Sequence, residues 1–170
     1  MIEADIFIPC YIEHIYPETG LNMVRLLEKA GVRVHYNERQ LCCGRLAFTS
    51  GYWDEAKAIG EKFIQEFNND RYIVGPSTSC IGYIRNHYDK LFYNTGLHLE
   101  YKKIQNNIYE FSDFIVNICG HLDFGASFEK VITFHDSCSA LREYGLGNEP
   151  RKLLSKVKGL KIKEMEERES

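Results

Sequence analysis

Cysteine is the residue type in this sequence whose spacing points most directly to chemistry. Cys42 and Cys43 are adjacent and are followed by Gly44; 31 residues separate Cys10 from Cys42, and 35 separate Gly44 from Cys80. Adjacent residues of a strand point to opposite faces, so two cysteines that serve one site must lie in a turn, and glycine supplies the backbone freedom for that turn. Four thiols from three segments can therefore converge on one point.

Composition indicates a globular chain that can bury a core. The sequence has 170 residues, of which 44% are hydrophobic and 26% are charged, as in ordinary folded domains. The formal net charge of -3 argues against a nucleic-acid partner. The basic run over residues 151–163 is followed at once by glutamates, which is typical of a solvated face.

The N-terminus and the thiols both bear on location. The first residues lack the basic start and long apolar core of a signal peptide, and no apolar run approaches membrane-spanning length. We therefore expect a cytoplasmic protein without direct membrane insertion. Thiols stay reduced in that compartment, so six cysteines with ordered spacing favour metal or redox chemistry over structural disulfides.

Along the first half of the chain, short apolar runs alternate with segments whose apolar residues recur at the three- and four-residue spacing of a helix. The pattern predicts strands at 5–9, 32–36 and 72–75, helices at 18–30 and 53–67, and a further helix that opens at Cys80. Each cysteine segment follows a predicted strand. Such units favour right-handed crossovers and a parallel sheet, in which ligands bind beyond the carboxyl ends of the strands. We predict an α/β fold, with a parallel sheet built from βαβ units and helices on both faces.

The second half of the chain is harder to interpret. Residues 90–103 carry no clear pattern, and the apolar-rich run 108–118 predicts a helix. Cys119 stands at the end of that run and after no strand, so we interpret it as a packing residue, because free cysteine often behaves as a small buried hydrophobe. A fourth strand is predicted at 130–134, and it leads to Cys138.

From Cys138 onward the chain begins to repeat itself. Residues 10–31 and 138–159 both begin with cysteine and end with glycine, and the same offset of 128 residues aligns further apolar positions. We therefore divide the chain into a first repeat, 1–125, and an incomplete second repeat, 126–170. On this register Ser170 falls where the paired cysteines of the first repeat begin, so we expect the natural chain to continue with a second Cys-Cys-Gly.

These cysteines resemble the cysteine-rich CCG motif of a family that includes the CCG-bearing subunit of heterodisulfide reductase and the iron–sulfur subunits of glycolate oxidase and of lactate utilisation. Cys10, Cys42-Cys43-Gly44 and Cys80 resemble its first copy, and His135-Asp136-Ser137-Cys138 resembles the opening of its second copy. The segments most similar to the lactate-utilisation branch are Pro76-Ser77-Thr78-Ser79-Cys80 and Pro150-Arg151-Lys152-Leu153-Leu154.

The resemblance implies a non-catalytic, iron–sulfur electron-transfer subunit of a complex that oxidises a small 2-hydroxy acid such as lactate or glycolate. Its expected partners are other iron–sulfur or flavin subunits. Tyr83 stands where the fullest form of the motif has a second cysteine three residues after Cys80, so a five-thiolate cluster is not expected. Cys138 is implied to bind a cofactor in the intact second repeat. The residues implied to bind a 4Fe-4S type cluster are Cys10, Cys42, Cys43 and Cys80.

Two alternatives stay open from the residues themselves. Four thiolates suit a cubane-type cluster or a zinc ion, so a zinc-stabilised or thiol-based binding protein without a redox centre is the alternative function. Reduced buried thiols and a redox disulfide pair are less favoured interpretations of the same spacing. Because such clusters are lost in air, we expect an aerobic preparation to lack the cluster or to carry a Cys–Cys disulfide in its place.

Overall fold

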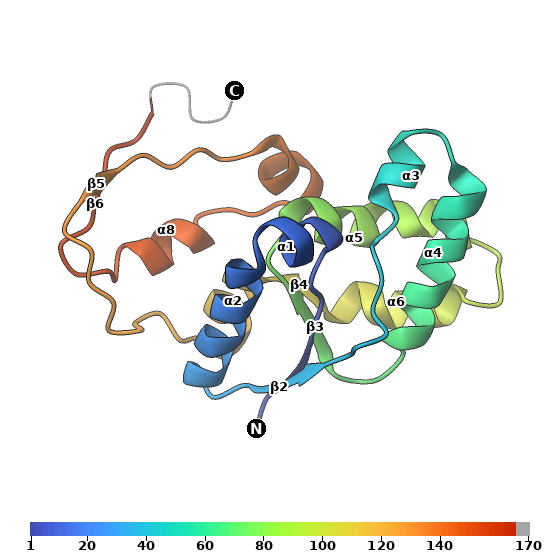
Figure 1. Cartoon of the computed structure of the whole chain (residues 1–170), viewed down its shortest axis with the longest axis horizontal. Helices are drawn as coiled ribbons and strands as arrows, with labels where there is room; N and C mark the ends of the chain where they lie inside the picture. Colours follow the sequence, from blue (N-terminus) through green and yellow to red (C-terminus); the bar gives the residue numbers. More distant parts are fainter. Residues whose placement is uncertain (166–170) are drawn as a thin grey trace.

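A four-stranded parallel sheet forms the centre of the molecule (Figure 1). The computed structural model describes residues 1–165. The strands lie in the order β2-β1-β3-β4, and neighbouring strands are parallel throughout. Apolar residues of β1 and β3 are buried, as expected for a sheet covered on both faces. The strands are β1 (Glu3–Ile6), β2 (Arg33–Tyr36), β3 (Tyr72–Gly75) and β4 (Ile108–Glu110).

Helices cover both faces of this sheet and confirm the predicted α/β architecture. One face packs against α2 (Pro17–Lys29) and the π-helix η1 (Phe114–Cys119). The opposite face packs against α4 (Trp53–Glu66), α5 (Thr78–Phe92) and α6 (His98–Asn107). Three short helices complete this part of the chain: α1 (Cys10–Ile15), α3 (Arg45–Thr49) and α7 (Phe111–Asp113).

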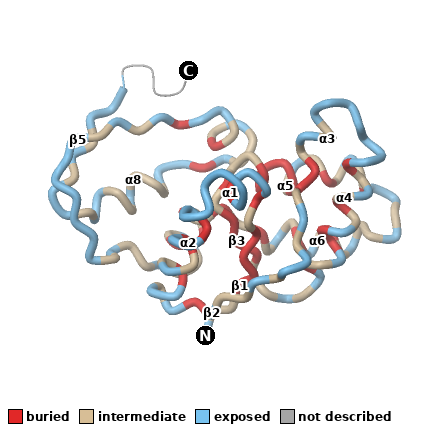
Figure 2. The backbone as a smooth tube through the Cα atoms, viewed as in Figure 1, coloured by how far each residue is buried: buried red, intermediate tan, exposed pale blue. Residues whose placement is uncertain are grey.

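Two apolar cores hold these layers together, one on each side of the sheet. Figure 2 shows the buried segments concentrated on the central strands and on the helices around them. Ala4 and Ile6 of β1 face Met23 and Leu27 of α2. On the other side, Phe7 packs edge-on against an aromatic ring of α4, with ring centroids 5.0 Å apart. Burying one large apolar side chain stabilises a fold by about 1.5–3 kcal/mol, so these two cores fix the positions of the strand ends.

The strand order creates a switch point between β1 and β3. The chain leaves β1 toward β2 on one side and leaves β3 toward β4 on the other. In open parallel sheets, ligands bind in the crevice outside the carboxyl ends of the strands at such a point. The loops after β1, β2 and β3 therefore meet at the edge of the sheet where a site is expected.

The structure corrects three of the predicted elements. The strand predicted at 5–9 begins earlier and ends at Ile6, and the strand at 130–134 is only two residues long. Residues 108–110, expected to begin a helix, form the edge strand β4 instead. A three-residue strand followed at once by helices has too few residues to show a period of two, so its apolar run looks like part of the helix. The sequence of α6 shows no clear helical pattern of apolar residues, because the helix buries only Tyr101 and Ile104.

A second, smaller parallel sheet follows in the last part of the chain (Figure 1). It repeats two residue pairs of the β1–β2 register with the residue numbers raised by 128. Glu3 pairs with Arg33 and Ala4 with Val34 in the first sheet; Val131 pairs with Lys161 and Ile132 with Ile162 in the second. Its elements are β5 (Val131–Ile132), η2 (Ser139–Tyr144), α8 (Glu149–Leu154) and β6 (Lys161–Ile162).

The turn before each second strand is repeated as well. Gly31 and Gly159 both adopt left-handed backbone angles, with φ of +82° and +76°, which glycine reaches without strain. The pseudo-repeat predicted from the sequence is therefore present in the fold. Ser170, which corresponds in register to Cys42, lies outside the described residues. Within residues 1–165, no helix has both the length and the apolar content needed to cross a membrane.

Candidate metal centre

Three loops at the carboxyl edge of the main sheet carry four thiols. Cys10 lies just beyond β1 and begins α1, while Cys42 and Cys43 lie in the loop after β2. Cys80 lies just beyond β3, in the first turn of α5. The predicted site residues of the first repeat thus share one edge of the sheet, next to the switch point between β1 and β3.

The four thiols form a chain of contacts. The Sγ atoms of Cys10 and Cys42 are 3.4 Å apart, and the Cys43 thiol interacts electrostatically with the thiols of both Cys42 and Cys80. No three His, Cys, Asp or Glu side chains of residues 1–165 are already arranged around one metal ion. The thiols are adjacent, and side-chain rotation is needed to close them around a single point. Their chemistry fits soft, thiophilic metals such as the iron of a cluster or zinc.

Gly44 shapes the loop that carries the paired cysteines. Its φ of +83° lies in the left-handed region, and its backbone N–H donates to the Cys42 sulfur at 3.5 Å. A Cβ atom at this position would lie 3.3 Å from the carbonyl oxygen of Ala56 and 3.3 Å from Cγ2 of Ile59. Glycine is therefore required both by the backbone angle and by the close approach of α4.

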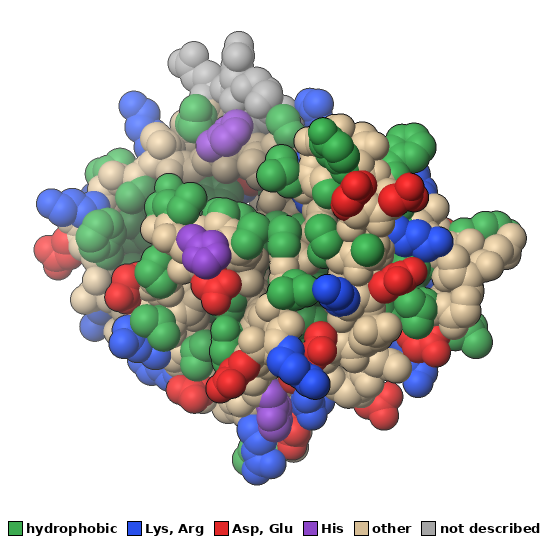
Figure 3. All heavy atoms as spheres, turned by 45° about the vertical axis from the view of Figure 1, so that its right-hand side comes forward, with side chains coloured by type: hydrophobic (Ala, Val, Ile, Leu, Met, Phe, Trp, Pro, Cys, Tyr) green, Lys and Arg blue, Asp and Glu red, His purple; other side chains and the backbone are tan. Residues whose placement is uncertain are grey.

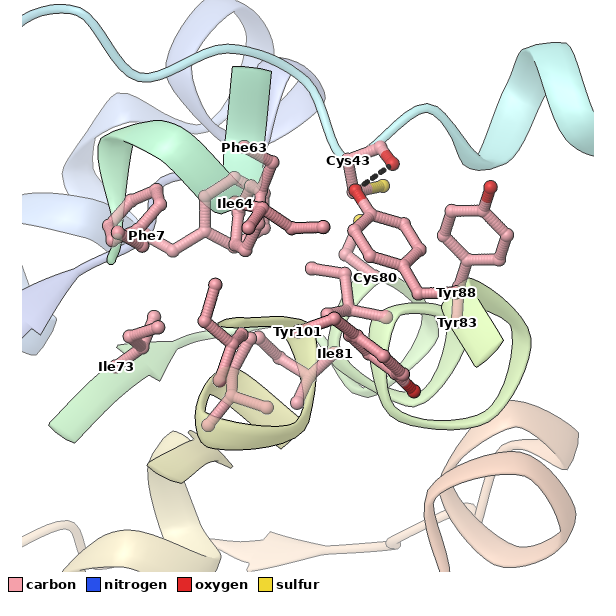
Figure 4. Close-up of a cluster of buried hydrophobic side chains, with 14 of the residues drawn as sticks. Phe7, Cys43, Phe63, Ile64, Ile73, Cys80, Ile81, Tyr83, Tyr88 and Tyr101 are labelled. Carbon is pink, nitrogen blue, oxygen red and sulfur yellow. Dashed lines mark hydrogen bonds between the residues drawn. The ribbon is translucent and has the colours of Figure 1, made fainter. Parts of the chain in front are cut away.

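Hydrogen bonds fix the loops relative to one another. The backbone N–H of Ile8 donates to the side-chain oxygen of Gln40 at 2.7 Å, which joins the loop after β1 to the loop after β2. The Tyr88 hydroxyl donates to the Cys43 carbonyl oxygen at 2.8 Å (Figure 4). Ser77 caps α5 by accepting from the backbone N–H of Cys80 at 3.4 Å.

The contacts between the thiols distribute charge unevenly. The hydrogen bond from Cys43 lowers the pKa of Cys42 to about 5, with help from the Gly44 N–H, and the Cys43 thiol also lowers the pKa of Cys80 to about 7. Its interactions with Cys42 and Cys80, together with burial, raise the pKa of Cys43 itself. Burial, together with its contact to Cys42, raises the pKa of Cys10 to about 11. At neutral pH the site therefore holds one thiolate at Cys42 and a second thiol, Cys80, that ionises readily.

Tyr83 forms one wall of the site. It lies one helical turn after Cys80 on α5 and is 1% exposed. Its ring stacks on His87, with centroids 5.8 Å apart, and meets the ring of Tyr88 edge-on at 5.4 Å. Burial, followed by the charges of Cys43 and Cys42, raises the pKa of Tyr83. In the sequence, Tyr83 was notable only because it stands where the motif has a cysteine. Since Tyr83 follows Cys80 by three residues, a helix places the two side chains on the same face.

The remaining cysteines lie elsewhere. Cys138 is exposed at the start of η2 and, within residues 1–165, lies outside the chain of contacting thiols. The neighbouring Ser139 hydroxyl lies 3.3 Å from that of Thr78, so η2 packs beside the start of α5. Cys119 packs, half-buried, against the core beneath α2, as predicted. Asp136 is buried and accepts two hydrogen bonds from the Arg151 guanidinium, at 2.8 and 2.7 Å.

Comparison with known proteins agrees with this geometry. Residues 4–85 and 132–170 match the CCG cysteine-rich domain. The match falls in two segments, one in each part of the chain that shares the 128-residue register. The first segment contains Cys10, Cys42, Cys43 and Cys80, and the second contains Cys138.

Curated relatives extend the similarity over almost all of the chain. Lactate utilization protein A of Bacillus subtilis (strain 168) is 38% identical over 165 residues, which cover 96% of this chain and 69% of the relative. Lactate utilization protein A 1 of Bacillus anthracis (strain CDC 684 / NRRL 3495) is 35% identical over 170 residues, which cover 96% of this chain and 68% of the relative. This chain therefore belongs to the CCG cysteine-rich domain family and is homologous to lactate utilization protein A.

Proposed function

We propose that this chain is an iron–sulfur electron-transfer subunit that works in the oxidation of a small 2-hydroxy acid of the lactate or glycolate type. The observation that carries the proposal is the chain of four thiols at the carboxyl edge of one parallel sheet. The lactate utilization proteins to which the chain is homologous support the class of substrate. We place this work in the cytoplasm, where thiols stay reduced.

The proposed ligands of a 4Fe-4S type cluster are the four contacting thiols. Metal ligands must be deprotonated, and the low pKa values of Cys42 and Cys80 make two thiolates available near neutral pH. Cys43 and Cys10 would release their protons on binding. The group would supply one-electron transfer, while the Gly44 turn and the hydrogen bond from Tyr88 hold the cysteine loop in position.

The proposed partners, other iron–sulfur or flavin subunits, would approach the exposed side of the site. Cys10 is exposed at the sheet edge, and large apolar side chains close to the cysteines in sequence are exposed as well, among them Tyr11, Leu41 and Leu46. The face drawn in Figure 3 carries exposed hydrophobic side chains interspersed with charges of both signs. Exposed apolar surface bordered by polar residues is typical of protein–protein contacts.

We also infer that residues 1–125 and 126–170 are two copies of one unit, the second incomplete. The shared register of the two sheets and the paired glycine turns support this division. In this division Cys138 corresponds to Cys10, since each begins the helical segment that follows the first strand of its sheet. Cys138 would then serve a site of the second copy.

The direct test is anaerobic reconstitution with iron and sulfide. The unaltered chain should take up both and give a visible absorption band and, after one-electron reduction, an EPR signal. The double variant Cys42→Ser, Cys43→Ser should lose both. Cys119→Ser is the matched control, because this cysteine packs in the core away from the site.

Two results would contradict the proposal. Iron and sulfide uptake that is unchanged in the double variant would show that the paired cysteines are not ligands. Tight binding of zinc by the unaltered chain, without any stable iron–sulfur product, would favour a structural zinc site, since four thiolates suit both.

A further inference from the structure

The hydroxyl group of Tyr83 lies in the buried wall of the thiol site, where residues 1–165 offer it no hydrogen-bond partner. The residue is 1% exposed, and its Oη atom has no hydrogen-bond partner among the residues that the structure describes. A buried polar group that is left unpaired costs roughly 1–3 kcal/mol of stability. Such groups are rare in folded proteins, and each one calls for a physical reason.

Two other buried tyrosines near Tyr83 show the usual arrangement. Tyr88 donates to the carbonyl oxygen of Cys43 at 2.8 Å, and Tyr101 donates to the carbonyl oxygen of Arg85 at 2.9 Å. Figure 4 shows the rings of Tyr83 and Tyr88 side by side, with both hydroxyl groups on the side of the Cys43 loop. The Tyr88 hydroxyl meets Cys43, and the Tyr83 hydroxyl points to the same side of its own ring without such a contact.

The described neighbours of Tyr83 supply its hydroxyl with no acceptor. The Tyr83 ring is enclosed by aromatic neighbours, Phe48 at 5.3 Å and His87 at 5.8 Å between centroids. Burial and, after it, interactions with the Cys43 and Cys42 thiols raise the pKa of Tyr83. Because Tyr83 follows Cys80 by one helical turn, the hydroxyl and that thiol also share a face of α5.

We propose that Tyr83 is a positioning residue whose hydroxyl donates a hydrogen bond to a sulfur atom of the cluster held by Cys42, Cys43 and Cys80. The inference rests on the proposed function. The sulfur acceptor is either a cysteine thiolate or an inorganic sulfide, both of which accept hydrogen bonds when negatively charged. The cluster would then give this hydroxyl the partner that the described residues do not supply.

This hydrogen bond has a predictable effect on electron transfer. A reduced cluster carries one more negative charge than the oxidised cluster, so a donor to its sulfur stabilises the reduced state more. Hydrogen bonds to the sulfur atoms are one of the factors that set the reduction potential of such clusters. Loss of the donor should make the cluster harder to reduce.

The test compares Tyr83→Phe with Tyr101→Phe after anaerobic reconstitution with iron and sulfide. Phenylalanine keeps the ring and removes only the hydroxyl in both variants. In a redox titration followed by EPR, Tyr83→Phe should lower the ratio of reduced to oxidised cluster by roughly tenfold at a fixed potential, a shift of about 59 mV to more negative values. Tyr101→Phe should leave the potential unchanged, because its hydroxyl bonds to Arg85 away from the thiols.

A second measurement uses the metal-free protein. In urea, the unfolding midpoint of metal-free Tyr83→Phe should equal or exceed that of the unaltered chain, because no hydrogen bond is lost. The midpoint of Tyr101→Phe should fall. A lower midpoint for Tyr83→Phe would show that its hydroxyl already has a partner in the metal-free protein and would overturn the assignment.

The outcomes separate this assignment from the proposed function. Normal iron and sulfide content in Tyr83→Phe with an unchanged potential would overturn the role of the tyrosine and leave the cluster intact. Failure of the unaltered chain to bind iron and sulfide would overturn the proposed function, and the tyrosine assignment with it.

Discussion

The sulfur atoms of Cys10 and Cys42 lie 3.4 Å apart although they belong to loops that follow different strands. The contact arises because β1 and β2 are parallel neighbours, so their carboxyl ends lie at the same edge of the sheet. A disulfide bond measures about 2.03–2.05 Å between sulfurs. Only a small side-chain movement would therefore join this pair when no metal group holds the thiols apart.

We expect air oxidation of the metal-free protein to link Cys10 to Cys42. Two thiols would lose two protons and two electrons, with dissolved oxygen as the electron acceptor, and the free-thiol count should fall by two. Peptide mapping under non-reducing conditions would identify the linked pair. Cys42→Ser should abolish the link, whereas Cys119→Ser should retain it. Recovery of the linked peptide from Cys42→Ser, or a link between other cysteines in the unaltered chain, would contradict the expectation.

The alkylation of Cys42 should depend on pH in a characteristic way. Its pKa of about 5, lowered by the hydrogen bond from Cys43, keeps it a thiolate at neutral pH. Because the thiolate is the nucleophile, reaction with iodoacetamide should be near its maximum at pH 7 and should fall as the pH drops through about 5. Cys10, with its pKa raised to about 11, should react slowly at pH 7 and faster only in alkaline solution.

Mass spectrometry of reduced, metal-free protein, quenched at intervals from pH 4 to 9, would give both rate profiles. Cys119 offers a reference thiol, because burial alone raises its pKa to about 11. A Cys42 profile that rises only above pH 8 would show that Cys43 does not stabilise the thiolate.

Substitution of Gly44 by alanine should destabilise the fold by about 1–3 kcal/mol, the cost of a non-glycine residue in a strained backbone region. The left-handed φ of +83° and the contacts that the new Cβ would make with Ala56 and Ile59 both contribute. Urea unfolding of the metal-free protein would measure the loss. Gly96→Ala is the matched control, since an added Cβ there meets no described atom within 4 Å. Equal stability of the two variants would contradict the role given to Gly44.

The positions of the four thiols could be predicted because strand order and loop placement follow from simple patterns. The apolar runs before Cys10, Cys42 and Cys80 are short, and helices separate them, which favours parallel strands with a common carboxyl edge. The 128-residue register was also visible, because Gly31 and Gly159 mark equivalent turns.

Other features depend on tertiary contacts that no local pattern encodes. β4 is a strand because Ile108 pairs with Ile73 across the sheet, although its sequence runs directly into a helix. The thiolate at Cys42 depends on which neighbouring sulfur donates and which accepts, and spacing does not determine this. The unpaired hydroxyl of Tyr83 likewise becomes apparent only when all of its neighbours are placed.

Replacement of Cys138 by serine tests the division into two repeats. In our proposal this thiol corresponds to Cys10 of the first copy and does not bind the cluster of the first site. Cys138→Ser should therefore leave unchanged the iron and sulfide bound through Cys10, Cys42, Cys43 and Cys80, whereas Cys10→Ser should reduce both. Substitution of Cys138 could also affect the first site indirectly, because η2 packs on α5. Ser139, next to Cys138, contacts Thr78 near the start of α5.

Thr78→Val distinguishes such an indirect effect from ligation. This variant removes the hydroxyl that faces Ser139 and keeps every cysteine, so a loss of packing would affect it and Cys138→Ser alike. If Cys138→Ser lowers the iron content of the first site while Thr78→Val does not, Cys138 is a ligand of that site and the two copies share one centre. If neither variant changes the iron content, Cys138 is not a ligand of the first site, as we expect from the shared register of the two sheets.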